Sequence, residues 1–231
     1  MNNSWTVLGG WGVPPEELRP IFGDSSIYID VNMLAEVICT AGHLATDWKE
    51  RIAAAVLPHL ENSPLLAGWS TGAILALGCA PLLNLDGLAL ISCTPSFCRN
   101  ATFRFGVHPR ILRGMRDKLA TNPATVLRDF RRQCGFPVNR SFNAPWTPDA
   151  LQAGLHLLEQ IVLDPAAFPL SCEPLFMHGT RDTIIPFDAG SYLHHSSGGV
   201  FVPFDAPHAC FIGNETEITS QLETYLQRNK Q

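Results

Sequence analysis

The sequence lacks the features that direct a protein to a membrane or out of the cell. Its first residues show no basic stretch followed by an apolar run, which is the pattern of a secretory leader. The most apolar region, residues 73–91, is interrupted by Pro81, Asn84 and Asp86, so it does not suit a membrane-spanning helix. We therefore expect a cytoplasmic protein that does not bind a membrane.

No two of the seven cysteines form a C-x-x-C pair. Scattered cysteines argue against a zinc ribbon and against a disulfide framework, and they suit a reducing compartment. The adjacent residues His194 and His195 have no nearby carboxylate or cysteine that would complete a set of metal ligands. The sequence therefore predicts no metal site.

Charged residues are also scarce, at 16% of the 231 residues, whereas hydrophobic residues make up 46%. This composition and length predict one α/β domain, or one domain with an insertion, around a substantial core. The predicted strands are residues 5–8, 27–31, 88–92, 174–178 and 199–204 and the run that leads into Ser70. The predicted helices are residues 47–60, 71–77 and 187–195 and a final one marked by Ile218, Leu222 and Leu226.

This alternation predicts a mostly parallel sheet with helices on both faces, whose chemistry gathers at the carboxyl ends of the strands. It is interrupted between residues 95 and 169, where the chain is helical in character and carries no strong strand. We interpret this segment as an inserted helical lid over the strand ends. The core then comprises residues 1–94 and 170–231.

The pentapeptide G-W-S-T-G, centred on Ser70, matches the pattern G-x-S-x-G between a predicted strand and a predicted helix. A turn this sharp leaves room only for hydrogen at the two glycine positions. It presents the serine hydroxyl at a helix N-terminus, where the backbone dipole favours developing negative charge. We therefore predict that Ser70 is a nucleophile rather than an idle residue in a connecting turn.

A serine hydroxyl becomes a useful nucleophile when a base takes its proton and an acid orients the base. In this topology the acid and then the histidine follow later strands. Asp182 follows one predicted strand, and His208 follows the next. Asp188 and Asp205 are rival acids that lie one element out of register, and a simple helix cap is the plainer alternative for Asp182. We predict the catalytic triad Ser70, Asp182 and His208.

An acyl-transfer site also needs N–H donors for the oxyanion. One donor should be the backbone N–H of Thr71, directly after the nucleophile. The other should come from the G-G-W-G segment after the first strand, where we favour the backbone N–H of Trp11. The alternative is that this segment is only a flexible turn. Its predicted place beside Ser70 favours the role as an oxyanion donor.

The net charge of −5 hides a strong asymmetry. Residues 99–140 contain ten basic and two acidic side chains, a balance of +8, and the rest of the chain carries −13. A basic lid suits an acidic or phosphorylated partner, whereas the alternative is a solvated helical face paired with acids of the core. Nucleic acid is not expected, because the segment lacks a recognised binding motif. The candidates for docking are Arg113, Arg116, Arg128, Arg131 and Arg132.

Together these residues resemble the α/β-hydrolase family over nearly the whole chain, and within it the pimeloyl-[acyl-carrier-protein] methyl ester esterases of biotin synthesis. The matching segments are G-G-W-G, G-W-S-T-G, L-I-S-C-T-P-S-F-C, G-L-H-L-L-E-Q-I-V-L-D and D-A-P-H-A-C-F-I. The sequence departs from the family pattern at Gly9, where a histidine is usual. We also expect the opening β-hairpin to be missing and the lid to be shorter than is typical.

The resemblance implies an enzyme that cleaves the methyl ester of pimeloyl-acyl-carrier-protein and needs no metal or organic cofactor. In that mechanism Ser70 attacks the ester, His208 transfers the proton, and Asp182 orients the imidazole. Two other interpretations stay open. One is a thioesterase or general short-chain esterase with the same triad, and the other is a non-catalytic protein that uses the basic lid to hold a partner.

Overall fold

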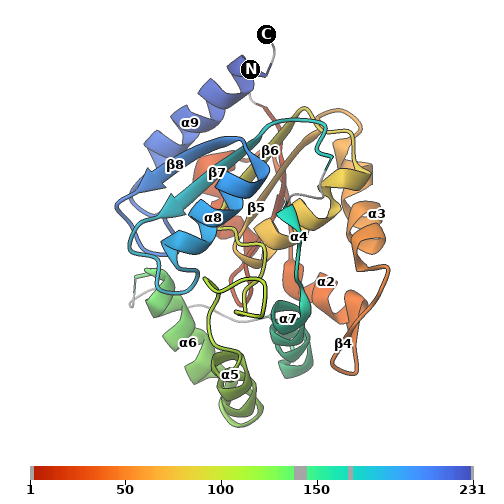
Figure 1. Cartoon of the computed structure of the whole chain (residues 1–231), viewed down its shortest axis with the longest axis vertical. Coiled ribbons are helices and arrows are strands. Elements are labelled where there is room, and N and C mark those ends of the chain that lie inside the picture. Colours follow the sequence, from red (N-terminus) through yellow and green to blue (C-terminus); the bar gives the residue numbers. More distant parts are fainter. Residues whose placement is uncertain (1–2, 138–144, 166–168, 230–231) are drawn as a thin grey trace.

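The computed structural model describes residues 3–137, 145–165 and 169–229. Six strands form one parallel sheet in the order β2-β1-β5-β6-β7-β8 (Figure 1). These strands are β1 Thr6–Leu8, β2 Ile27–Ile29, β5 Leu65–Trp69, β6 Gly87–Ile91, β7 Pro174–Gly179 and β8 Val200–Phe204. A separate antiparallel pair consists of β3 Cys39–Thr40 and β4 His43–Leu44. The predicted parallel sheet is confirmed.

The central strands β5 and β6 are buried at every residue. Their register pairs Ala67 with Ala89 and Gly68 with Leu90. A strand that is covered on both faces has no solvent side, so it carries a continuous apolar run rather than an alternating pattern. This is why L-L-A-G-W and G-L-A-L-I are apolar throughout, and it gives Ser70, the residue after β5, a rigid support.

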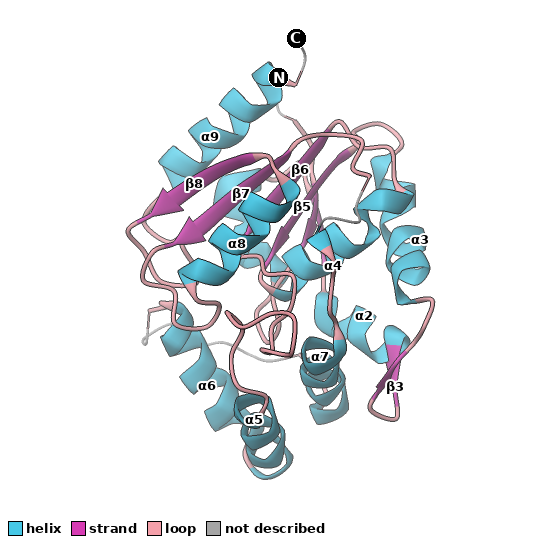
Figure 2. Cartoon of the chain, in the orientation of Figure 1, coloured by secondary structure: helices cyan, strands magenta, loops and turns pink. Residues whose placement is uncertain are grey.

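Helices cover both faces of the sheet (Figure 2). On the face toward the viewer lie α3 Trp48–Leu60, α4 Thr71–Cys79 and α8 Phe187–Ser197. On the other face, α1 Arg19–Phe22 packs with α9 Glu215–Arg228. Short 3-10 turns, η1 Pro15–Leu18 and η2 Ala80–Leu82, precede α1 and follow α4. Within the described ranges, no helix has the length and apolar character to cross a membrane.

Three helices fall within the segment predicted as a lid and stand beyond the carboxyl ends of the strands (Figure 2). They are α5 Arg110–Thr121, α6 Pro123–Cys134 and α7 Pro148–Gln160. Helix α7 packs against α5 and also against α2 Val31–Ile38, a helix that the sequence pattern did not indicate. The predicted strand 27–31 ends early, because Asp30 caps α2 by accepting a hydrogen bond from the backbone N–H of Asn32.

Candidate active site

Ser70 occupies the sharp turn between β5 and α4. Its backbone has φ +56° and ψ −119°, a conformation that is strained for a residue with a side chain. A Cβ atom at Gly68 would collide with the carbonyl group of Gly72. A Cβ atom at Gly72 would collide with the carbonyl oxygens of Leu8 and Gly9. The two glycines therefore permit both the turn and the close approach of α4 to the loop after β1.

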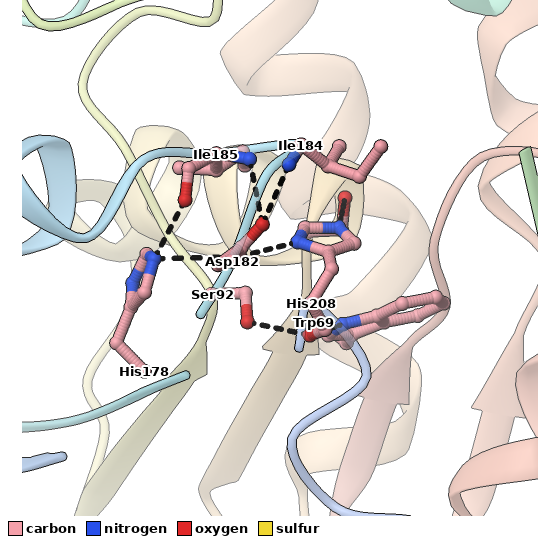
Figure 3. Close-up of polar contacts among 8 residues, drawn as sticks. Trp69, Ser92, His178, Asp182, Ile184, Ile185 and His208 are labelled. Carbon is pink, nitrogen blue, oxygen red and sulfur yellow. Dashed lines mark hydrogen bonds and ion pairs between the residues drawn. The ribbon is translucent and has the colours of Figure 1, made fainter. Parts of the chain in front are cut away.

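Three side chains from distant parts of the chain form one hydrogen-bonded row. Ser70 Oγ lies 2.8 Å from His208 Nε2. His208 Nδ1 lies 2.7 Å from Asp182 Oδ2 (Figure 3). A carboxylate only accepts, so His208 Nδ1 carries the hydrogen and Nε2 is left to accept the hydroxyl proton of Ser70. His208 is fully buried, and Ser70 is 4% exposed. The arrangement is that of a Ser-His-Asp triad, with the members in the predicted order.

The Asp182 carboxylate is held by several donors. Its Oδ1 accepts hydrogen bonds from the backbone N–H groups of Ile184, at 2.8 Å, and Ile185, at 2.9 Å (Figure 3). Burial by itself would raise the pKa of Asp182, but the charge of His208 and hydrogen bonds from His178 and His208 outweigh burial and hold this pKa well below its usual range. Asp182 is therefore the ionised partner that orients the imidazole.

The rival acids lie elsewhere. Asp205 pairs with Arg181 at 2.7 Å on the surface, and Asp188 lies in the first turn of α8. No hydrogen bond joins either carboxylate to His208 among the residues that the structure describes. Across the same ranges, no three His, Cys, Asp or Glu side chains are grouped so that they could hold a metal ion.

The backbone carbonyl of His208 is held from two neighbouring strands, an arrangement that the sequence did not indicate. The indole Nε1 of Trp69 donates to it at 3.1 Å, and the hydroxyl of Ser92 donates at 2.8 Å (Figure 3). Ser92 follows β6 directly and has φ +50°, a strained conformation like that of Ser70. The sequence offered only a weak signal for these two donors, namely a side chain with a polar hydrogen at the end of an apolar strand.

We expect Ser92→Ala and Trp69→Phe each to lower kcat for ester hydrolysis by about threefold to tenfold, because one donor to the His208 carbonyl remains in each variant. The double variant leaves a buried carbonyl oxygen unpaired, so its loss should exceed the product of the single losses. Steady-state kinetics on all four proteins measures this coupling. Losses that simply multiply would contradict a shared acceptor.

The two predicted oxyanion donors lie beside the nucleophile. Trp11 and Thr71 line the same cavity as Ser70. Trp11 is anchored through its side chain, whose Nε1 donates to the carbonyl oxygen of Leu151 at 2.9 Å. Within the described ranges the backbone N–H groups of Trp11 and Thr71 donate no hydrogen bond to the protein. Both groups are therefore available to a substrate oxygen, and their role as donors stays a prediction.

A cavity of about 610 Å³ adjoins Ser70 and extends along α5 and α6. Its apolar lining includes Phe97, Val107, Met115, Val126, Phe130 and Leu158. Its polar lining, from α5 to α6, includes Arg110, Lys118, Asn122, Asp129 and Gln133. Such a lining suits an apolar acyl chain with a polar attachment.

The arginines predicted to dock a partner differ in exposure. The side chains of Arg113, Arg128 and Arg132 are 58%, 66% and 62% exposed. Arg128 and Arg132 lie near Asp129 of the same helix, at 3.8 and 3.5 Å, which is a weak surface pairing. These three side chains can meet a partner. Arg140, which contributes to the basic balance of this segment, lies outside the described residues.

Two of the predicted docking arginines are less exposed and pair with acids of other elements. Arg116 is 14% exposed and pairs with Glu159 of α7. Arg131 is 7% exposed, pairs with Glu17 Oε1 at 3.2 Å and places its guanidinium over the ring of Phe136, 4.4 Å from the ring centroid. The prediction that Arg131 belongs to a docking surface is therefore wrong, because the ion pair with Glu17 buries it between α6 and the core.

Three comparisons with known proteins were made: with family models, with curated sequences and with solved structures. No family model matches the chain. The chain is 27% identical to the pimeloyl-[acyl-carrier protein] methyl ester esterase of Aromatoleum aromaticum, over 81% of this chain and 82% of that protein. It is 28% identical to the enzyme of the same name from Pseudoalteromonas atlantica, over 95% and 92%.

Solved structures resemble the whole chain. An esterase from Exiguobacterium antarcticum superposes with a TM-score of 0.75 at 18% identity, over 97% of this chain and 92% of that one. The enol-lactonase from Burkholderia xenovorans superposes with a TM-score of 0.73 at 15% identity, over 98% and 92%. The chain therefore has the α/β-hydrolase fold, with a Ser-His-Asp arrangement at the carboxyl ends of its strands.

Proposed function

We propose that this protein is a serine carboxylesterase that hydrolyses the methyl ester of pimeloyl-acyl-carrier-protein through an acyl-enzyme. The observation that carries the chemistry is the buried row of Ser70, His208 and Asp182, with hydrogen-bond distances of 2.8 and 2.7 Å. The substrate is supported by the distant likeness to pimeloyl-[acyl-carrier protein] methyl ester esterases over most of the chain.

In the acylation step, Ser70 Oγ attacks the ester carbonyl carbon as His208 Nε2 takes the hydroxyl proton. Negative charge develops on the carbonyl oxygen, where the backbone N–H groups of Trp11 and Thr71 and the N-terminus of α4 stabilise it. The protonated imidazole then gives its proton to the departing methoxy oxygen. Methanol leaves, and the acyl group remains as an ester on Ser70.

In the deacylation step, a water molecule repeats the attack on the acyl-enzyme. His208 Nε2 takes a proton from the water and later returns it to Ser70 Oγ, so that the free carboxylic acid leaves and the enzyme is restored. Asp182 stabilises the imidazolium in both steps because it is ionised and accepts from His208 Nδ1 at 2.7 Å. The sequence of steps needs only water as a second substrate.

The exposed basic residues of α5 and α6 favour a carrier-bound substrate over a free ester. Arg113, Arg128 and Arg132 are exposed on α5 and α6, the same helices whose other faces line the cavity beside Ser70. A carrier protein is acidic and holds its acyl group on a phosphorylated arm, so it complements a basic surface. Docking on α5 and α6 would leave the acyl group to enter the cavity between them.

The proposal is tested by hydrolysis of a panel: pimeloyl methyl ester on the carrier protein, the free methyl ester, and a matched thioester. Methanol release and release of the carrier thiol are measured separately. We expect the highest kcat/KM for methanol release from the carrier-bound ester. Release of the thiol, or equal activity on the free ester, would instead support a thioesterase or a general short-chain carboxylesterase.

Charge reversal tests the docking surface. We expect Arg128→Glu and Arg132→Glu, singly and together, to raise KM for the carrier-bound ester, about tenfold in the double variant, through lost electrostatic attraction. Activity on a small p-nitrophenyl ester should stay within about twofold, because that ester needs no docking. Arg228→Glu, on the exposed end of α9, is the matched control. Equal losses on both substrates would contradict docking on these arginines.

A further inference from the structure

His178 is a second histidine at the Asp182 carboxylate, and the proposed mechanism does not use it. It lies in β7 and is 1% exposed. Its Nε2 lies 2.9 Å from the carbonyl oxygen of Ile185 and 3.4 Å from Asp182 Oδ2 (Figure 3). Both oxygens can only accept, so His178 Nε2 carries a hydrogen that faces the two of them.

The imidazole of His178 is enclosed on its other side. A Cβ atom at Gly190 of α8 would collide with His178 Nδ1, so the backbone of α8 packs directly on the ring. The ring of Phe187 meets it edge-on, with centroids 6.0 Å apart and an interplanar angle of 84°. Burying a polar ring this completely is costly unless its hydrogen-bonding groups are used. The ring is thus held in the orientation that aims Nε2 at the loop containing Asp182.

We propose that His178 is a positioning residue for Asp182: its Nε2–H bridges the Ile185 carbonyl and Asp182 Oδ2 and keeps the carboxylate in line with His208. This inference rests on the proposed mechanism. Ile185 is bound on both sides, because its N–H donates to Asp182 Oδ1 at 2.9 Å and its carbonyl accepts from His178. The carboxylate and its loop therefore form one hydrogen-bonded unit that is anchored to β7.

The N–H of His178 also shares Oδ2 with His208. Without that N–H, the carboxylate would no longer be held in line with His208 and would stabilise the protonated imidazole less. Since Ser70 is activated only by the neutral imidazole, the acid limb of the pH profile should then move to lower pH.

Among the described residues, the charge of Asp182 also acts on two other titratable groups, neither of which titrates in this pH range. They are the thiols of Cys134, at the end of α6, and Cys210, two residues after His208. Burial and then the charge of Asp182 raise the pKa of Cys134 well above its ordinary value and that of Cys210 to about 12. Both thiols are neutral where the acid limb is measured.

The test compares His178→Leu, which has no donor, with His178→Gln, whose amide N–H takes the place of Nε2–H. The exposed His195→Leu is the matched control. We expect the leucine variant to lose about tenfold to a hundredfold in kcat on a p-nitrophenyl ester, with KM nearly unchanged and the acid limb of kcat/KM at lower pH. The glutamine variant should have most of the wild-type kcat, and its acid limb of kcat/KM should lie at the wild-type pH. The proposal would be overturned if kcat fell only in proportion to the fraction of folded protein and the acid limb of kcat/KM stayed at the wild-type pH.

A second measurement does not depend on turnover. The proton on His208 Nδ1, hydrogen-bonded to Asp182, gives a downfield NMR signal, and this signal should move in His178→Leu and in Gly190→Ala, which displaces the ring without removing it. An unmoved signal in a folded variant would overturn the proposal. If the wild-type protein hydrolyses no ester and does not react with a fluorophosphonate at Ser70, the proposed function fails, and the NMR comparison still decides the role of His178.

Discussion

Ser70→Ala should lower kcat for ester hydrolysis by about four to six orders of magnitude, because the variant has no group that can form the acyl-enzyme. The fold should survive, since the strained turn depends on Gly68 and Gly72 rather than on the hydroxyl. Binding of the carrier-bound ester should survive too, because the cavity and the exposed arginines are unchanged. Steady-state kinetics and a binding titration on the same protein measure both effects.

Ser220→Ala, on the exposed face of α9, is the control for this experiment and should retain full activity. A fluorophosphonate should label the wild-type protein and the control but not Ser70→Ala. Turnover that persists in Ser70→Ala would exclude Ser70 as the nucleophile. A wild-type protein that binds the carrier but has no turnover at all would support the non-catalytic alternative.

Asp182→Asn should lower kcat by about ten-thousandfold. The reason lies in the hydrogen bonds around the side chain. The N–H groups of Ile184 and Ile185 donate to Oδ1, so they would hold the amide oxygen of an asparagine in that place. The amide nitrogen would then face His208 Nδ1 as a donor, which forces the imidazole hydrogen onto Nε2. That tautomer cannot accept the proton of Ser70.

The same variant tests the charge of Asp182 through stability. Because the folded protein lowers the pKa of this carboxyl, its ionised form contributes to the free energy of unfolding above the unfolded pKa of about 3.9. This contribution is lost as the pH falls through the lower folded value. The difference in unfolding free energy between wild type and Asp182→Asn should therefore be largest near neutral pH and shrink in acid. A loss of kcat below about tenfold, or a difference that grows in acid, would contradict this role.

The local turn around Ser70 was predictable because the pattern that indicates it lies within five residues of sequence. Two glycines, an apolar strand before them and an apolar helix after them leave few backbone conformations. The acid and the histidine were predictable by order, since each follows a strand of a parallel sheet whose carboxyl ends share one edge. The structure brings Ser70, Asp182 and His208 within hydrogen-bond distance at that edge.

Helix α2 escaped prediction because Val31 extends the apolar run that begins at Ile27. Asp30 caps the helix that begins there, and a single aspartate is a weak signal in the sequence. The set of five arginines predicted to dock a partner was too broad, because exposure was not visible in the sequence. Charge can be counted from sequence, but the pairing of Arg131 in α6 with Glu17 in η1 cannot be inferred from the positions of the charges along the chain.

By itself the sequence determined the order of the sheet strands, the turn at Ser70 and the residue types available as acid and base, because these follow from neighbours along the chain. Only the tertiary structure decided which donors hold the triad: Trp69 and Ser92 on the His208 carbonyl, and His178 at Asp182. The first two contacts and the Arg131–Glu17 pair join residues more than one hundred positions apart. They depend on which strands lie side by side and on how α6 packs against the rest of the fold, and no local pattern encodes that.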